Sequence, residues 1–321
     1  MKLPSFLFGL LFSSLSISQS ASHLEALQTF KTHYNNGDAS SAYGMMAPAM
    51  QEALGEENVV RIITTFRKEL GNMRTIRFVR KENFREVYET QFENGVQNMS
   101  IAVNKEGQLS GLRFEQAEQQ SRPAHMYRNE TVLSLPFKGT WFTVWGGDTK
   151  AQNYHVTYKA QQGAFDFLVL GDNNKTYQRS GTRNEDYFAF GKPIFAVCDG
   201  EIINVITGVE DNKPGAMNPG QALGNSVTIK TANNEYIVYA HFEKGTIKVS
   251  EGQQVKRGQL LGRCGNSGNS SEAHLHLHIQ DEPSLLTAVG VKCYFDRILV
   301  NGEVKTDYSP VRLDRIAPTN E

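Results

Sequence analysis

Three histidines alternate with apolar residues in the segment Ala273-His-Leu-His-Leu-His-Ile-Gln280. Successive side chains of a β-strand point to opposite faces, so His274, His276 and His278 would share one face, with neighbouring residues ~7 Å apart. The apolar residues between them would then face the core. Such an array can bind a metal with one imidazole while the next reaches the substrate. The plainer alternative is a solvated polar face, but each imidazole brings two polar nitrogens that need partners.

A fourth histidine, His241, ends the apolar segment Val238-Tyr-Ala-His241. Alternation places it on the same face as Tyr239. Alone, such a histidine is more often structural than catalytic. It gains significance from its neighbours along the chain, which are a glycine-rich hairpin over 249–262, the loop Gly265-Asn-Ser-Gly268, and then the histidine strand.

These motifs, in this order and spacing, resemble the lysostaphin/LytM-type zinc metallopeptidases. The resemblance extends over about residues 132–300 and is densest from Pro193 to Gln280. It implies a mostly antiparallel all-β domain that cleaves peptide bonds in peptidoglycan. It also implies a role for each histidine: His274 is the general base, His276 is a zinc ligand, and His241 helps to hold the water and stabilise the transition state.

The other two ligands of the resembled family come from a His-x-x-x-Asp motif, and here the sequence departs from it. Asp166 matches the aspartate, but Gln162 stands at the histidine position, and a carboxylate often found after the His-x-His pair is replaced by His278. An amide oxygen is a weaker donor for zinc than an imidazole nitrogen. The polar residues after His155 can loop out between two strands at a modest closure cost and return this ring to the metal. We therefore predict His155, Asp166 and His276 as ligands of one Zn²⁺. The plainer alternatives are a surface-loop histidine and a surface carboxylate.

This residue set can support hydrolysis. Catalytic zinc usually has three protein ligands and keeps one position for water, whose pKa it lowers while it polarises the scissile carbonyl. A neutral imidazole can take the proton and return it to the leaving amine.

The leading hypothesis is therefore an exported zinc metalloendopeptidase that acts on peptidoglycan peptides. The alternative, favoured by Gln162, is a catalytically inactive module that binds cell-wall peptides or regulates another wall hydrolase. A zinc-independent carrier has no positive support in the residues.

The composition is that of a folded protein able to position such a site. The 321 residues suggest about two domains. With 33 basic against 34 acidic side chains, the net charge of −1 argues against a disordered chain or a basic nucleic-acid binder. The only long apolar run lies at the start, so no membrane span is expected in the mature chain. The sequence leaves the oligomeric state open.

Residues 1–22 are predicted to be a secretory signal peptide. Lys2 precedes an apolar core from Phe6 to Leu15, and small residues come after it, so cleavage is expected after Ser20 or Ser22. The apolar run is too short for a resident membrane helix, and a core helix is the plainer alternative. The protein is therefore expected in the periplasm or outside the cell.

Three cysteines, Cys198, Cys264 and Cys293, would permit one disulfide in an oxidising compartment. The sequence does not choose among the pairings, and burial as small apolar residues is the alternative for each. None has a Cys-x-x-Cys spacing, so no thiolate metal site is expected.

Residues 23–116 are predicted to form a small α+β domain. Leu24, Leu27, Phe30 and Tyr34 recur at helical spacing, and Asp38 can cap a second helix over 39–46. A third helix is expected from about Glu56 to Leu70, and four strands over 75–80, 86–90, 97–103 and 108–115. This element order weakly resembles the cone-shaped nuclear-transport-factor-like domains. Because no paired acid and base is present, binding or spacing is the favoured role.

The rest of the chain is divided into three segments. Residues 117–131 are expected to be a linker, 132–300 the β-rich metallopeptidase domain, and 301–321 a polar C-terminal tail. Strands of the large domain are expected over 140–144, 164–170, 200–205, 225–230 and 236–241, with Asn233-Asn234 as a hairpin turn.

Overall fold

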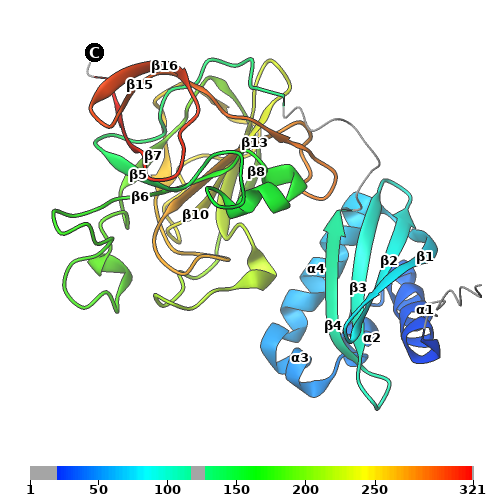
Figure 1. Ribbon diagram of the computed structural model, residues 1–321. Coiled ribbons are helices and arrows are strands. Elements are labelled where there is room, and N and C mark those ends of the chain that lie inside the picture. Colours follow the sequence, from blue (N-terminus) through cyan, green and yellow to red (C-terminus); the bar gives the residue numbers. More distant parts are fainter. Residues whose placement is uncertain (1–19, 117–126, 320–321) are drawn as a thin grey trace, which may run out of the picture. The chain divides into compact units, whose positions relative to one another are not determined.

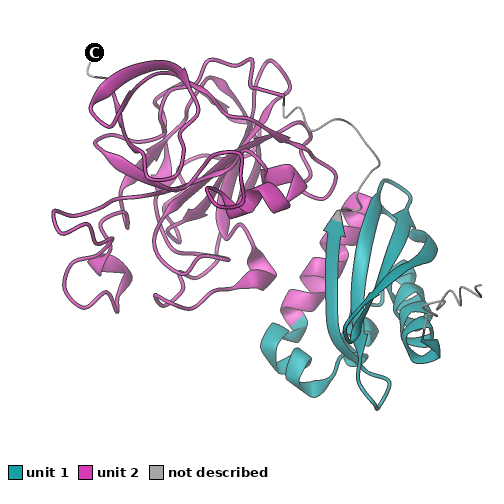
Figure 2. Ribbon diagram, in the orientation of Figure 1, with its two compact units in different colours: residues 1–56, 71–117 teal, residues 57–70, 118–321 magenta. Residues whose placement is uncertain are grey.

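The computed structural model describes residues 20–116 and 127–319. The chain divides into two compact units, one of residues 1–56 and 71–117 and the other of residues 57–70 and 118–321 (Figure 2). A small N-terminal domain with helices is followed by a mostly antiparallel β domain, as predicted. The predicted signal peptide, as far as residue 19, and positions 117–126 of the predicted linker lie outside the described residues.

The N-terminal part contains four helices and one antiparallel sheet (Figure 1). The helices are α1 (Ala21–Asn36), α2 (Ala39–Gly44), α3 (Pro48–Leu54) and α4 (Glu56–Leu70). The strands are β1 (Met73–Glu82), β2 (Arg85–Phe92), β3 (Val96–Val103) and β4 (Leu109–Gln116), paired in that order. The four predicted strands and the helix over 56–70 are thus confirmed. Helix α3 was missed because it has no buried face: none of its residues is buried.

Helix α1 shows how local sequence sets an element's bounds. Leu27, Phe30 and Tyr34 are buried as predicted, but Leu24 is 38% exposed. Gly37, at φ 73°, ends the helix in the left-handed conformation that glycine adopts without a side-chain penalty. The carboxylate of Asp38 then accepts a hydrogen bond from Ser41 N–H and caps α2, as predicted.

The second unit is built on a long antiparallel sheet (Figure 1). Its path runs β11-β8-β9-β10-β13-β6-β5-β17-β15-β16, and β14 pairs with β13. Strands β7 and β12 form a separate two-stranded sheet. The bounds are β5 (Trp141–Trp145), β6 (Phe165–Leu168), β7 (Pro193–Phe195), β8 (Gly200–Ile206), β9 (Asn225–Lys230), β10 (Tyr236–Phe242), β11 (Gln254–Val255), β12 (Leu260–Arg263), β13 (Leu275–Gln280), β14 (Gly290–Val291), β15 (Phe295–Val300), β16 (Glu303–Tyr308) and β17 (Arg315–Pro318). The five strands predicted for this domain are all present.

Strand β13 lies between β10 and β6 in the middle of this sheet. Leu275, Leu277 and Ile279 are at most 1% exposed and belong to the main apolar core. The predicted alternation is therefore correct, and it turns the histidines of the same strand to the opposite face. The solvated polar face considered for them is wrong, because His276 and His278 are also buried.

The segment after residue 300 is not the surface tail that its polar composition suggested. Strand β16 pairs with β15, and β17 lies between β15 and β5 in the sheet. Ile316 is fully buried in the core and anchors β17, which is an interior strand of the sheet. Strand β16 is the edge strand, and such a strand is hard to recognise from composition because its side chains stay mostly exposed and polar.

Two further findings bear on the sequence expectations. All three cysteines are buried and free, as the alternative to a disulfide proposed. Within residues 20–116 and 127–319, no helix combines the length and the apolar character needed to cross a membrane.

Candidate metal and catalytic site

The register of two neighbouring strands brings the first pair of predicted ligands together. On β6 and β13, Asp166 is directly opposite His276. On the other side of β13, His276 is opposite Ala240 of β10. Because side chains of directly opposed residues lie on the same face of a sheet, the carboxylate meets the imidazole. Nδ1 of His276 is 2.9 Å from Oδ1 of Asp166.

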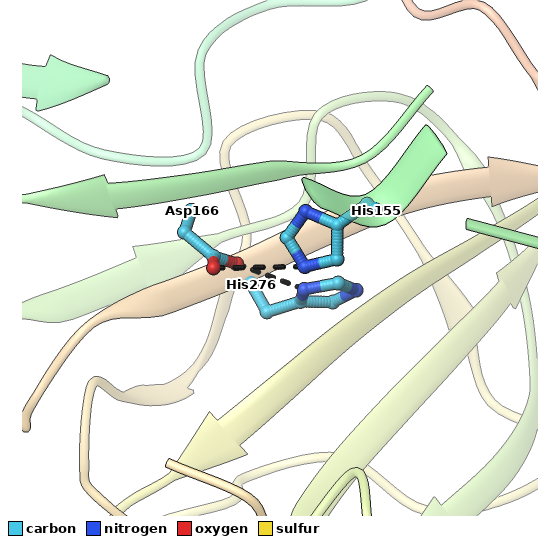
Figure 3. Close-up of side chains that lie close together, drawn as sticks. All are labelled: His155, Asp166 and His276. Carbon is cyan, nitrogen blue, oxygen red and sulfur yellow. Dashed lines mark hydrogen bonds and ion pairs between the residues drawn. The ribbon is translucent and has the colours of Figure 1, made fainter. Parts of the chain in front are cut away.

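The third predicted ligand comes from outside the sheet. His155 lies in a short 3-10 helix, Tyr154–Thr157, and a second one, Lys159–Gln161, comes after it before β6 begins. Between His155 and Asp166 the chain passes through these two turns, and the histidine lies over the strand (Figure 3). Nε2 of His155 is 3.6 Å from Oδ2 of Asp166. The candidate ligand atoms of His155, Asp166 and His276 all lie within 4.8 Å of one another.

A buried amide orients the His155 ring. Nδ2 of Asn153 donates hydrogen bonds to the carbonyl oxygens of Gly147 and Ala164, so Oδ1 of Asn153 must face the histidine. This oxygen accepts hydrogen bonds from the backbone N–H of His155 and from its Nδ1, at 3.2 and 2.8 Å. The proton of the neutral ring therefore sits on Nδ1, and Nε2 presents its lone pair to Asp166.

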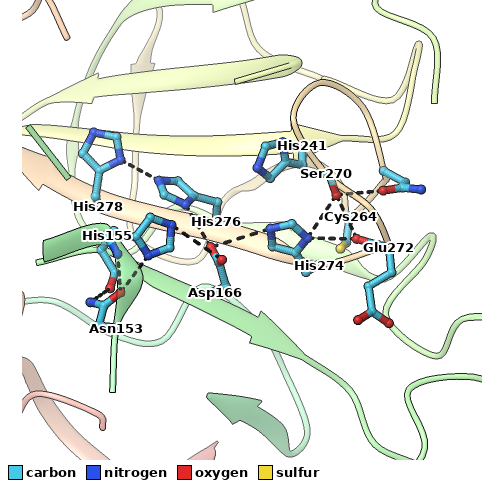
Figure 4. A network of polar contacts seen from close by, with 12 residues as sticks. Asn153, His155, Asp166, His241, Cys264, Ser270, Glu272, His274, His276 and His278 are labelled. Atoms are coloured by element: carbon cyan, nitrogen blue, oxygen red, sulfur yellow. Dashed lines mark hydrogen bonds and ion pairs between the residues drawn. The ribbon is translucent and has the colours of Figure 1, made fainter. Parts of the chain in front are cut away.

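His274 stands just before β13 and is the least buried of the imidazoles at the site, with its side chain 12% exposed. Its Nδ1 donates to the carbonyl oxygen of Glu272 at 2.8 Å and lies 3.1 Å from Oγ of Ser270. Its Nε2 consequently carries the lone pair and is 3.6 Å from Oδ1 of Asp166 (Figure 4). An imidazole in this state can accept a proton at the edge of the metal group.

His241 is held beside His274, with ring centres 4.7 Å apart. Its Nδ1 donates to the carbonyl oxygen of Ser267 at 2.8 Å, which leaves the lone pair on Nε2. Its backbone has φ 67°, a left-handed conformation that costs a non-glycine residue free energy. The β9–β10 pairing has an irregularity between Tyr239 and Phe242, and this turns His241 out of the plain strand geometry.

Two glycines allow the Gly265–Gly268 loop to reach His241. A Cβ on Gly224 would stand 2.4 Å from the carbonyl oxygen of Ser267, and a Cβ on Gly268 would stand 2.3 Å from the backbone nitrogen of Gly224. Both glycines also have positive φ. Their missing side chains let the two loops pack backbone to backbone, so that the Ser267 carbonyl lies within hydrogen-bonding reach of the His241 ring.

Burial and neighbouring charge set the protonation of the group. Burial lowers the pKa of His155 to about 4 and lowers the pKa of His241 well below its ordinary value, so both rings are neutral near pH 7. Burial by itself would raise the pKa of Asp166, but the positive charge of the imidazoles of His155, His274 and His276 when they are protonated, together with the hydrogen bond with His276, outweighs burial and lowers the pKa of the carboxyl. The site therefore combines a buried anion with the neutral imidazoles of His155 and His241.

The donor set fits a divalent cation such as zinc. Asp166 is only 4% exposed, and among the described residues its ion-pair partners are histidines, with no lysine or arginine. Buried charges are normally paired or bind a metal. Two imidazoles and a carboxylate are a donor set that zinc takes in catalytic sites. His155, Asp166 and His276 would hold the ion, while the lone pairs of His241 and His274 stay free of it.

The structure brings together all five residues predicted for the site, but the sequence analysis missed the residues that position them. Asn153 gave no signal beyond standing two residues before a histidine. Ser267 was noticed only as part of a glycine-rich loop. Gln280 was read as the end of a strand, although it continues the face of His276 and His278.

Two protein-family models match parts of the chain. Residues 183–286 match the sequence profile of peptidase family M23. This match contains His241, His274 and His276 but begins after His155 and Asp166. Residues 28–112 match a family described as a protein of unknown function, DUF3887.

Individual relatives are similar over only part of their length. The chain is 30% identical over 129 residues to the cell division protein DipM of Caulobacter vibrioides, covering 39% of this chain and 19% of that protein. It is 30% identical over 152 residues to the peptidoglycan DD-endopeptidase ShyC of Vibrio cholerae, covering 43% of this chain and 32% of that protein. The chain thus spans about a fifth to a third of the length of these curated relatives.

Among solved structures, the catalytic domain of the antimicrobial peptidase lysostaphin from Staphylococcus simulans is similar to this chain. The identity is 21% and the TM-score is 0.28, over 47% of this chain and 86% of that chain. The similarity to peptidase family M23 thus rests on the sequence of residues 183–286.

Proposed function

We propose that this protein is an exported zinc metalloendopeptidase that cleaves peptide bonds in peptidoglycan. The observation that carries the proposal is the convergence of His155, Asp166 and His276 on one point, with the Nε2 lone pairs of His241 and His274 beside it. The family match of residues 183–286 and the similarity to ShyC, a peptidoglycan DD-endopeptidase, support the substrate class. The signal-like start of the sequence supports export to the periplasm or the cell exterior.

The chain's own residues divide the chemical work. Zinc, when bound, supplies Lewis acidity that polarises a carbonyl and makes water a stronger acid. His274 accepts the proton of the attacking water at Nε2 and later returns it to the leaving amine, while the carbonyl oxygen of Glu272 keeps the opposite nitrogen protonated. His241 accepts a second hydrogen bond from the water at its own Nε2 and so fixes the direction of attack.

The alternative is a catalytically inactive module that binds cell-wall peptides. Its support was Gln162, which stands where the resembled family has a ligand. The placement of His155 beside Asp166 weakens this support, because the imidazole is available for the role that the amide cannot fill. The peptidase is therefore the better-supported proposal.

Digestion of soluble cross-linked muropeptides by the zinc-loaded full-length protein tests the proposal. Mass spectrometry should find hydrolysed peptide cross-links with wild type and none with His276→Ala. His33→Ala removes a histidine of helix α1 and should digest like wild type. Intact muropeptides with a wild type that carries zinc would contradict the proposed activity and favour the binding module.

A further inference from the structure

A line of hydrogen bonds leads away from the metal group along the buried face of β13. Nε2 of His276 is 2.9 Å from Nδ1 of His278 (Figure 4). Nε2 of His278 is in turn 3.0 Å from Oε1 of Gln280. Nε2 of Gln280 donates to the carbonyl oxygen of Glu282 at 2.6 Å. His278 and Gln280 are both 0% exposed, so water does not compete for these contacts.

The far end of the line fixes its direction. A backbone carbonyl only accepts hydrogen bonds, so the contact with Glu282 requires the NH₂ group of Gln280 on that side. The amide oxygen must then face His278, and it also only accepts. Nε2 of His278 therefore carries the ring proton, and Nδ1 of this neutral ring has the lone pair.

The donor and acceptor roles of the His278 ring also decide which nitrogen of the predicted ligand His276 carries its proton. Nδ1 of His278 accepts, so Nε2 of His276 must be the donor. The proton of a neutral His276 then sits on Nε2, and its lone pair sits on Nδ1, the nitrogen that lies 2.9 Å from Asp166 within the metal group. The reverse direction would set the lone pair of His278 Nε2 against the oxygen of Gln280, where nothing could lie between them. At the other end, the lone pair of His276 Nδ1 and the Asp166 carboxylate that faces it would both be directed at the bound ion.

We propose that His278 and Gln280 are positioning residues that fix the proton of His276 on Nε2 and so present its Nδ1 lone pair to the metal. The inference rests on the proposed zinc site and adds residues to it. It explains why two histidines and a glutamine alternate along β13: Gln280 sets the hydrogen-bonding state of His278, and His278 sets that of His276. Groups behind metal-bound histidines commonly fix the tautomer and the orientation of the ring in this way.

The two ligand imidazoles are controlled by the same kind of group. The amide oxygen of Asn153 accepts a hydrogen bond directly from Nδ1–H of His155. Another amide oxygen, that of Gln280, controls His276 through the intervening ring of His278. In both cases the NH₂ group of the amide donates to backbone carbonyl oxygens, which prevents the amide from turning over.

Two substitutions of His278 separate the effect of its hydrogen bonds from the effect of its volume. His278→Leu removes both hydrogen bonds of the ring, and we expect the zinc affinity of the full-length protein to fall about 10–100-fold. His278→Gln can accept from His276 with its oxygen and donate to Gln280 with its NH₂ group, so it should restore most of that affinity. Thr143→Val is the control, because it changes a buried residue of β5 whose hydroxyl has no hydrogen-bond partner among the described residues. Zinc affinity is measured by competition with a chromophoric chelator.

A spectroscopic readout tests the proton positions themselves. Long-range ¹H–¹⁵N correlation spectra of the zinc-loaded wild type should show His276 and His278 both protonated on Nε2 only. Gln280→Met removes the accepting oxygen, and His278 should then show a mixture of its two tautomers. The wild-type spectrum decides the matter even if a variant fails to fold.

The outcomes separate this inference from the proposed function. Wild type that binds zinc together with a His278→Leu variant that binds it equally tightly would overturn the inference alone. A wild-type spectrum with the His278 proton on Nδ1 would do the same. Wild type that binds no zinc would contradict the proposed function, and this inference would fall with it.

Discussion

The side-chain oxygen of Asn153 lies 2.8 Å from Nδ1 of His155 and holds that ring with Nε2 toward Asp166. Asn153 is fully buried, and its amide also ties together the loop at Gly147 and the residue before β6, Ala164. One amide therefore closes the irregular segment before β6 and orients the histidine that this segment carries. This contact therefore supports the placement of the predicted ligand His155 beside Asp166 despite their unusual spacing in the sequence.

Replacing Asn153 should weaken metal binding. Asn153→Leu leaves Nδ1 of His155 without its acceptor and two buried carbonyl oxygens without their donor. We expect the zinc affinity to fall about 10–100-fold and the free energy of unfolding to fall by about 1–3 kcal/mol. A chelator competition assay and urea unfolding measure the two effects.

Asn129→Leu is the matched control for this substitution. Asn129 is also buried, donates to the carbonyl oxygens of Thr131 and Tyr294, and accepts from a backbone N–H, but it contacts no histidine. The control should lose similar stability and keep its zinc affinity. Equal losses of affinity in the two variants would contradict a specific role for Asn153.

The choice between His155 and Gln162 can be tested by metal content. His155→Ala should lose bound zinc and muropeptide cleavage, because two remaining ligands hold the ion poorly. Gln162→Ala should retain the metal, since an imidazole already occupies the corresponding role. Zinc analysis after dialysis distinguishes them, and normal zinc content in His155→Ala would show that another group completes the ligand set.

His274 and His276 should fail in different ways. His276→Ala should release zinc, whereas His274→Ala should keep it and lose about 10²–10⁴-fold in cleavage rate, the usual contribution of a general base. The reason is that Nδ1 of His276 belongs to the ligand group, while Nε2 of His274 stands beside it. If His274→Ala lost zinc and His276→Ala retained it, the two roles would have to be exchanged.

The metal-free protein should lose stability in acid. The pKa of His155 is lowered from 6.5 in the unfolded chain to about 4 in the folded protein. The unfolded chain therefore binds more protons than the folded protein between these two pH values. The contribution of His155 to the free energy of unfolding is complete above pH 6.5 and is lost as the pH falls toward 4. This residue alone should lower the free energy of unfolding by about 2 kcal/mol between about pH 7 and pH 5.

Urea unfolding of wild type and His155→Gln at both pH values, in the presence of a chelator, measures this effect. The variant should show a smaller loss because the titrating ring is gone. Parallel losses in the two proteins would mean that His155 is not buried in its neutral form.

The sequence was sufficient where a side chain's role follows from strand alternation. The shared face of His274, His276 and His278 was predicted because a period of two leaves no other arrangement. The proximity of Asp166 and His276 was expected only from the resemblance to the metallopeptidase family, and the pairing and register of their two strands required the structure.

Residues that act through one specific contact could not be predicted. The buried position of Asn153 depends on two 3-10 turns that have no periodic signal. The strand β17 was missed because a single buried residue, Ile316, anchors it. The left-handed backbone of His241 arises from a strand irregularity and a close loop contact, neither of which local propensity encodes.

X-ray absorption at the zinc edge of the loaded full-length protein tests the central claim most directly. The account predicts one zinc per chain, with nitrogen and oxygen donors at about 2.0–2.2 Å and imidazole scattering from two histidines. It also predicts no sulfur at about 2.3 Å, because Cys198, Cys264 and Cys293 stand outside the ligand group. A sulfur donor, a single imidazole, or no bound zinc under replete conditions would contradict the ligand set of His155, Asp166 and His276.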